Sequence, residues 1–83
     1  MLNRNQLALF HAVSEEGGFG RAARRLHISQ PAVSSQVSQL EDVLGVRLFE
    51  RIGRSIRLTS AGAALAVYAK RIAALELEAA HTM

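Results

Sequence analysis

The segment between residues 29 and 44 constrains the fold most, because its apolar residues recur at helical spacing on one side only. Val33, Val37, Leu40 and Leu44 follow one another at intervals of four, three and four residues, which places them on one face of a helix. The other side chains of its first three turns are polar and uncharged: Gln30, Ser34, Ser35, Gln36, Ser38 and Gln39. A solvated helix surface usually mixes Lys and Glu, so this face suits close contact with another polar surface.

The charges along this helix indicate what that surface is. The acids Glu41 and Asp42 stand only toward its C-terminal end. A helix N-terminus carries partial positive charge and free N–H groups, both of which attract phosphate. We therefore interpret the segment as a helix that enters the major groove of DNA. A plain surface helix is the alternative for this stretch taken alone.

A short helix and a tight turn precede this segment. The helix is predicted over about residues 19–26, with Ala22 and Ala23 packed inward. Residues 27–30 form the connector, and Ile28 is expected to be buried beneath it. The proline that follows favours the first turn of the next helix. Two helices joined by so short a turn are typical of a helix-turn-helix motif.

The first helix is expected from its end signals and its apolar residues. Asn3 or Asn5 can cap its N-terminus. Phe10 and Val13 supply its buried side, and Gly17 favours the left-handed conformation that ends a helix. The sequence therefore predicts a third helix that packs on the helix-turn-helix.

Residues 47–58 predict a two-stranded wing. The dipeptide at 53–54, Gly followed by Arg, is typical of a hairpin turn. Ile56 and Leu58 alternate with Arg57, so one face of that strand is expected to be buried and Arg57 to point outward. The arginine of the turn sits at the tip, where a long cation reaches into a narrow groove.

A last helix is expected over about residues 60–80, with Thr59 as its N-cap. Its apolar seam has spacings of four and three residues, typical of helix–helix packing: Ala61, Leu65, Tyr68, Ile72, Leu75 and Ala79. The first half of the seam can cover the chain's own core, and the second half extends beyond it. We predict that two copies dimerise through Leu65, Tyr68, Ile72, Leu75 and Ala79, flanked by Lys70, Arg71, Glu76 and Glu78. Gly62 in the first turn is expected to allow close packing.

Composition agrees with a small nucleic-acid-binding domain. The chain has 83 residues, which is one small domain, a net charge of +3 and a pI of about 10.6. That pI exceeds the value of about 9 above which nucleic-acid binding is commonly inferred. Nine of the ten basic residues are Arg, whose planar guanidinium suits phosphate and guanine.

Other classes of function have little support in the sequence. The chain has no Cys, which excludes disulfides and thiolate metal sites and favours a reducing compartment. The longest apolar run, residues 61–69, is too short to span a bilayer, and no targeting segment is visible. His11, His27 and His81 lie far apart, and no nucleophile or glycine motif occurs. We therefore expect no enzyme, metal, cofactor or membrane contact. A helical interaction module that meets acidic partners is the second hypothesis.

A series of motifs covers nearly the whole chain, in the order Ala22-Ala23-Arg24-Arg25-Leu26, Ser29-Gln30-Pro31-Ala32-Val33-Ser34, Gln36, Leu40-Glu41, Leu44-Gly45, Leu48-Phe49-Glu50-Arg51 and Leu58-Thr59-Ser60-Ala61-Gly62. Together they resemble the N-terminal DNA-binding domain of LysR-type bacterial transcriptional regulators. The resemblance implies a mainly α fold: a winged helix-turn-helix of three helices plus a two-stranded wing over residues 1–59, with the motif at about 19–38. A long linker and dimerisation helix over residues 60–83 follows.

The resemblance also implies function and site residues. We expect a homodimer, or a higher oligomer in a full-length protein, that binds dyad-symmetric double-stranded DNA in the bacterial cytoplasm, associated with the nucleoid. The residues expected to read bases are Gln30, Pro31, Ala32, Ser34, Ser35 and Ser38. The residues expected to contact phosphate or to act from the wing are Arg21, Arg24, Ser29, Gln36, Arg51, Arg54 and Arg57, with Arg54 in the minor groove.

The sequence departs from the family pattern at several places. Gly20 stands where Thr or Ser commonly starts the second helix, Ser35 where Arg or Lys is frequent, and Ile52 where the wing usually has a polar residue. Such regulators also carry a C-terminal effector-binding domain that senses a small metabolite. That domain, and with it any effector site, is expected to be absent from this chain.

Overall fold

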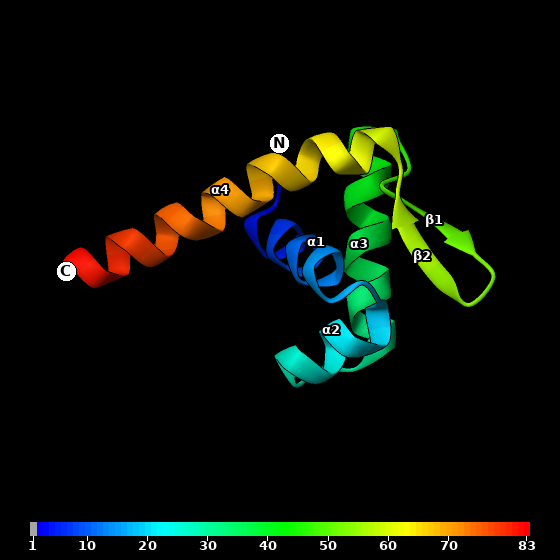
Figure 1. The fold of residues 1–83 in the computed structure, drawn as a ribbon, viewed down its shortest axis with the longest axis horizontal. Coiled ribbons are helices and arrows are strands. Elements are labelled where there is room, and N and C mark those ends of the chain that lie inside the picture. The colour runs from blue at the N-terminus through cyan, green and yellow to red at the C-terminus, as the bar shows by residue number, and fades with distance from the viewer. Residues whose placement is uncertain (1) are drawn as a thin grey trace.

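The computed structural model describes residues 2–83 and places six elements along the chain (Figure 1). They are α1 (Arg4–Glu16), α2 (Phe19–Leu26), α3 (Gln30–Leu44), β1 (Phe49–Ile52), β2 (Ser55–Leu58) and α4 (Ser60–Thr82). The strands form one antiparallel hairpin that projects from one side of the helices, and the C-terminal half of α4 projects from the other side (Figure 1). The arrangement confirms the predicted winged helix-turn-helix followed by a long helix.

The helix ends follow the local signals. Asn3, Ser29 and Thr59 are the N-caps of α1, α3 and α4, and each side-chain oxygen accepts a hydrogen bond from the backbone N–H three residues later. Gly17 and Gly45 end α1 and α3 in the left-handed conformation, with φ of 74° and 70°. Because these signals are local, the predicted bounds of the first three helices agree with the structure. The last helix runs two residues further than expected, to Thr82.

The core lies where α1, α2 and α3 meet the start of the hairpin. Its largest fully buried side chains are Phe10, Val13, Val33, Val37, Leu40 and Leu48. Phe49 at the start of β1 places its ring 5.3 Å from that of Phe10 and 5.5 Å from that of Phe19, measured between centroids. The wing is therefore fixed to the helices by aromatic packing as well as by the chain.

Two predicted core residues are exposed. Ile28 is 41% exposed because the turn after α2 is closed by its backbone N–H, which donates to the Ala23 carbonyl at 3.1 Å, while its side chain points outward. Leu44 is 38% exposed because the last turn of α3 extends beyond the core. The apolar stripe of α3 thus ends at Leu40.

α4 contacts the rest of the domain as far as Glu76, which pairs with Arg4, and its last turns project beyond it (Figure 1). Ala69 is 2% exposed, and Leu65 packs against the core cluster. Tyr68 and Leu75 are 58% and 63% exposed. The predicted seam therefore divides. Leu65 packs on the chain's own core and Ala61 is half-buried, whereas Tyr68, Ile72, Leu75 and Ala79 are exposed. Among residues 2–83, no helix is long and apolar enough to cross a membrane.

Candidate nucleic-acid interface

The N-terminal edge of α3 is a projecting polar surface. Gln30, Pro31, Ala32 and Ser35, which were predicted to read bases, are all exposed, as is Ser38 one turn further on. Ser34, the sixth predicted reader, is half-buried. The Ser29 hydroxyl accepts the N–H of Ala32 at 3.2 Å, so this predicted phosphate contact also holds the first turn together. The edge carries no charged side chain that would repel or compete with a nucleic acid.

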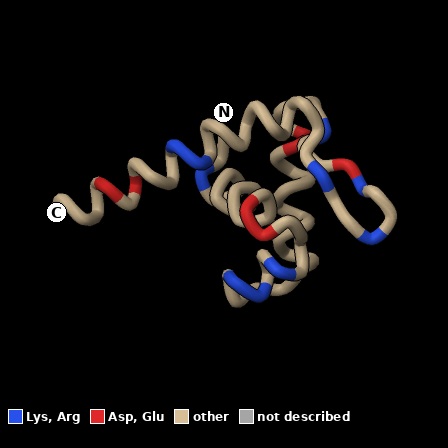
Figure 2. Tube along the Cα trace, viewed as in Figure 1, with Lys and Arg blue, Asp and Glu red and all other residues tan. Residues whose placement is uncertain are grey.

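Beside this edge lies a hollow of about 270 Å³ between α2, the start of α3 and the hairpin. Four arginines that the sequence analysis predicted as phosphate contacts line it: Arg21 and Arg24 from α2, and Arg51 and Arg54 from the hairpin. Gln30 at the start of α3 also lines the hollow. We name these four residues the arginine cluster. Figure 2 shows the basic residues of α2 and the hairpin that form it, with the acids of α3 at the far end of that helix.

The arginine cluster is free of acidic partners within residues 2–83, whereas Arg4, Arg25 and Arg57 are paired with acids. Arg25 binds Glu15 and Glu16 at 2.9 and 3.1 Å, and the Arg25 guanidinium holds the pKa of the Glu15 carboxyl below its usual value. Arg57, predicted to contact phosphate, is exposed but pairs with Glu50, its cross-strand neighbour. The cluster keeps its charge for an external anion, and guanidinium groups are well suited to phosphate.

The aromatic floor of the hollow holds one arginine in place. The Arg51 guanidinium carbon lies 5.9 Å from the centroid of the Phe19 ring. That ring in turn contacts Phe49 edge-on. Arg51 is thus oriented by packing before any ligand arrives, which lowers the entropic cost of binding.

Gln36 lies differently from what the sequence suggested. Its side-chain oxygen accepts a hydrogen bond from Gln6 of α1 at 3.2 Å, and the residue is half-buried. To contact phosphate as predicted, the Gln36 side chain would have to use its amide nitrogen, because its oxygen is bound to α1.

Glu41 anchors the wing, a role that the sequence analysis missed. Its carboxylate accepts the backbone N–H of Leu48 at 2.7 Å and that of Phe49 at 3.4 Å, and Arg47 Nε lies 4.0 Å away. The side chain is only 13% exposed. The acid at the end of α3 is therefore a structural link to the first strand. No local sequence pattern predicts this role of Glu41, because the carboxylate and the two N–H groups are brought together only by the fold.

Replacing Glu41 with Ala should lower the free energy of unfolding by about 1–3 kcal/mol, because it leaves two N–H groups near the core without their acceptor. For a domain of this size the melting temperature should fall by roughly 4–20 °C. Thermal denaturation measures the effect. Asp42→Ala is the matched control, since Asp42 is the exposed acid next to it. Equal melting temperatures for both variants would contradict the anchoring role.

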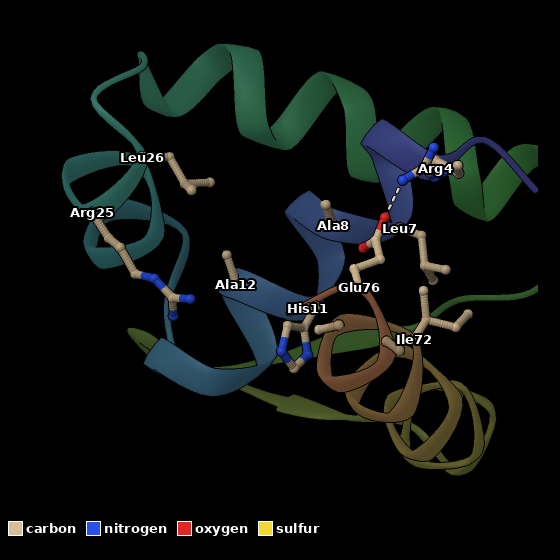
Figure 3. Close-up of a pocket in the computed structure, with 11 residues that line it drawn as sticks. Arg4, Leu7, Ala8, His11, Ala12, Arg25, Leu26, Ile72 and Glu76 are labelled. Carbon is tan, nitrogen blue, oxygen red and sulfur yellow. Dashed lines mark hydrogen bonds and ion pairs between the residues drawn. The ribbon is translucent and has the colours of Figure 1, made fainter. Parts of the chain in front are cut away.

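A second hollow, of about 200 Å³, lies between α1, α2 and α4 (Figure 3). It shares no residue with the arginine cluster, and apolar side chains such as Leu7 and Ile72 line it. Arg4 and Glu76 pair across its rim (Figure 3). Glu76, expected to flank a dimer contact, is thereby held by α1 of its own chain.

The remaining predicted dimerisation residues are accessible. Tyr68, Leu75 and Ala79 are exposed on one face of α4, and Ile72, which is 38% exposed, also lines the hollow toward α1. The Arg71 guanidinium carbon lies 5.8 Å from the Tyr68 ring centroid, at the edge of this face. No group of three or more His, Asp or Glu side chains in the described part of the chain is placed to hold a metal ion.

Comparison with known proteins gives a consistent result. Residues 4–63 match the family model described as the bacterial regulatory helix-turn-helix protein, lysR family. The chain is 57% identical over 67 residues to the transcriptional regulator TfdS of Cupriavidus pinatubonensis, covering 81% of this chain and 23% of TfdS. It is 51% identical over 67 residues to the RuBisCO operon transcriptional regulator of Allochromatium vinosum, covering 81% of this chain and 22% of that protein. The chain thus spans less than a quarter of the length of either relative.

A solved structure matches the fold closely. The crystal structure of the CbnR_DBD–DNA complex superposes with a TM-score of 0.86 at 43% sequence identity. The match covers 98% of this chain and 93% of that one. The likeness therefore includes the wing and the long last helix as well as the residues of the helix-turn-helix.

Proposed function

This chain belongs to the lysR family of bacterial regulatory helix-turn-helix proteins, and we propose that it binds specific double-stranded DNA sites as the DNA-binding part of a transcription regulator. One observation carries the proposal: an exposed, uncharged helix edge lies beside four arginines that have no acidic partner among residues 2–83. Base-reading and phosphate-binding groups are thus adjacent, as duplex recognition requires. The likeness to the CbnR_DBD–DNA complex supports it.

The proposed division of roles follows from shape and charge. An α-helix about 10–12 Å across fits the major groove, which is about 12 Å wide. The edge from Gln30 to Ser38 would face the bases there. The arginine cluster would hold the backbone between α3 and the hairpin, and Arg54 at the hairpin tip would reach the adjacent minor groove. Such a protein acts in the bacterial cytoplasm, with the nucleoid.

Selection of bound sites from a random duplex pool tests the proposal. We expect recovered sites with dyad symmetry and half-sites about one helical turn or more apart. Recovery of unrelated sequences, with affinity that depends on salt alone, would contradict sequence-specific binding. Undiminished binding of acidic proteins after Gln30, Ser34 and Arg54 are all replaced by Ala would favour the interaction-module alternative.

Dimerisation through α4 is the second part of the proposal. One face of α4 exposes Tyr68, Ile72, Leu75 and Ala79, beside and beyond the residues that pack on α1. A second copy of α4 would bury this face, and a two-fold interface uses each contact twice. Two joined copies would present two reading edges, as a dyad-symmetric site requires.

Leu75→Glu should weaken the dimer by more than about a hundred-fold, because burial of one Leu contributes about 1.5–3 kcal/mol and the symmetric contact contains two. Sedimentation equilibrium measures the dissociation constant. The matched control is Leu77→Glu: Leu77 is 60% exposed, close to the 63% of Leu75, but lies on the opposite side of the helix. A dimer weakened equally by both substitutions would place the contact elsewhere.

A further inference from the structure

Gln6 is a buried amide on the face of α1 that packs against α3. It is 7% exposed and is the one polar side chain of the buried class within residues 2–83. Burial of an amide is costly unless its hydrogen bonds are made. Its partners are therefore a fixed part of the fold.

The Gln6 side chain starts a directed series of hydrogen bonds. Its Nε2 donates to Oε1 of Gln36 and to Oε1 of Gln39, both at 3.2 Å, so each amide hydrogen has its own acceptor. Because the Gln39 oxygen faces Gln6, the Gln39 amide nitrogen faces the other way and donates to Ser35 Oγ at 3.5 Å. The backbone N–H of Gln6 also donates to the Asn3 cap at 3.0 Å, which fixes the residue along α1.

This direction determines what Ser35 offers to a ligand. A serine hydroxyl has one hydrogen to donate and two lone pairs to accept with. One lone pair receives the Gln39 N–H, so the hydroxyl hydrogen and the second lone pair remain available at the exposed edge of α3. Ser35 can thus donate as well as accept.

We propose that Gln6 is a positioning residue that acts through Gln39 to keep the hydroxyl hydrogen of Ser35 free to donate to an acceptor of a base in the major groove. The inference rests on the proposed function, since it requires α3 to lie in that groove. Guanine, adenine and thymine present an acceptor there, whereas cytosine presents only its amino donor. Guanine and thymine, which present no donor there, can bind Ser35 only through this hydrogen, and one hydrogen bond corresponds to on the order of five-fold in affinity.

The test measures relative affinity for duplexes that carry each of the four bases at every half-site position. Ser35→Ala identifies the position that Ser35 reads, because the preference there is lost. Gln6→Glu then reverses the direction of the hydrogen bonds: a carboxylate only accepts, so Gln39 turns its amide nitrogen inward and its oxygen toward the hydroxyl of Ser35. Ser35 must then present lone pairs only, so guanine and thymine should lose on the order of five-fold in affinity relative to adenine and cytosine, which each present an amino donor.

Gln39→Ala is the second variant, chosen because Gln39 is exposed and its loss leaves the core intact. In combination with Gln6→Glu it should restore the base ratios to within about two-fold of the wild-type values, because Ser35 then has no Gln39 oxygen to donate to. Val43→Ala, at an exposed position of the same helix, is the matched control and should leave all base ratios unchanged. The ratio between bases is the readout, because the added negative charge of Gln6→Glu weakens binding to every sequence alike.

The outcomes distinguish failure of the role proposed for Gln6 from failure of the proposed DNA-binding function. In a Ser35→Ala background, Gln6→Glu should no longer alter the base ratios, whereas a merely structural role would alter these ratios in both backgrounds. Unchanged ratios in Gln6→Glu, ratios that Gln39→Ala does not restore in that variant, or a Ser35→Ala variant that changes no position, overturn the inference and leave the proposed function standing. Wild-type protein without any base preference overturns the proposed function and the inference with it.

Discussion

Replacing Gly62 with Ala is expected to lower the free energy of unfolding by about 3 kcal/mol or more, a large part of the roughly 4–12 kcal/mol typical of a domain this size. A Cβ at this position would lie 2.0 Å from the Leu48 carbonyl oxygen, 2.9 Å from its carbon and 3.0 Å from Leu58 Cδ2. The obstacle is backbone, and it cannot move freely because the same oxygen accepts the Thr59 N–H at 3.0 Å. The start of α4 must therefore separate from the hairpin.

Gly20→Ala provides the matched comparison, since Gly20 is also in the first turn of a helix. There the nearest atoms to an added Cβ are Gln30 Oε1 at 3.5 Å and Arg24 Nη1 at 3.7 Å, which is ordinary contact. This variant should be more stable than the wild type by about 0.5–1 kcal/mol, because Ala favours the helix. Urea denaturation of both proteins gives the two values. Similar midpoints for the two variants would show that the close approach at Gly62 is not needed.

The largest expected effect on binding is that of replacing Arg24 and Arg51 together with Ala. These residues reach the hollow from α2 and from β1 and have no acidic partner within residues 2–83. Each phosphate contact that is lost should reduce the slope of log K against log salt by about 0.9, so the slope should fall by about 1.8. At about 0.15 M salt this corresponds to roughly thirty-fold weaker binding. Fluorescence anisotropy titrations at several salt concentrations measure both quantities.

The control carries the same change in net charge at paired arginines. Arg4 binds Glu76 and Arg25 binds Glu15 and Glu16, so Arg4→Ala with Arg25→Ala should leave the salt slope within about half a unit of the wild-type value. If both double variants lower the slope equally, overall charge rather than the arginine cluster determines affinity.

Features with a short-range cause were predictable from the sequence. The caps at Asn3, Ser29 and Thr59 depend on the side chain and a backbone N–H three residues away. The Gly53 turn, with φ of 58°, depends on the conformational freedom of one residue. Alternation along β2 indicated correctly that Arg57 is exposed while its neighbours are half-buried. Helix bounds and the hairpin could therefore be placed without any knowledge of packing.

Features that depend on distant partners could not be placed in this way. Ile28 and Leu44 are apolar and correctly spaced, but their burial depends on where neighbouring elements end in space. Glu41 and Gln6 matter through partners 7 and 30 or more residues away. The pair of Glu50 and Arg57 likewise depends on the register of the hairpin, which places the two residues opposite each other. The roles of individual residues on DNA and in the dimer stay predictions.

The junction at Thr59 has a mechanical consequence. This residue joins the hairpin to α4: its N–H donates to the Leu48 carbonyl, its hydroxyl donates to the Arg47 carbonyl at 2.6 Å, and its oxygen caps the helix. No flexible tether separates the two elements, so a torque on the helix is transmitted to the hairpin tip. With 23 residues at about 1.5 Å each, α4 is a stiff arm roughly 34 Å long. A small tilt of α4 therefore moves the hairpin tip, by a distance that grows with the angle of the tilt.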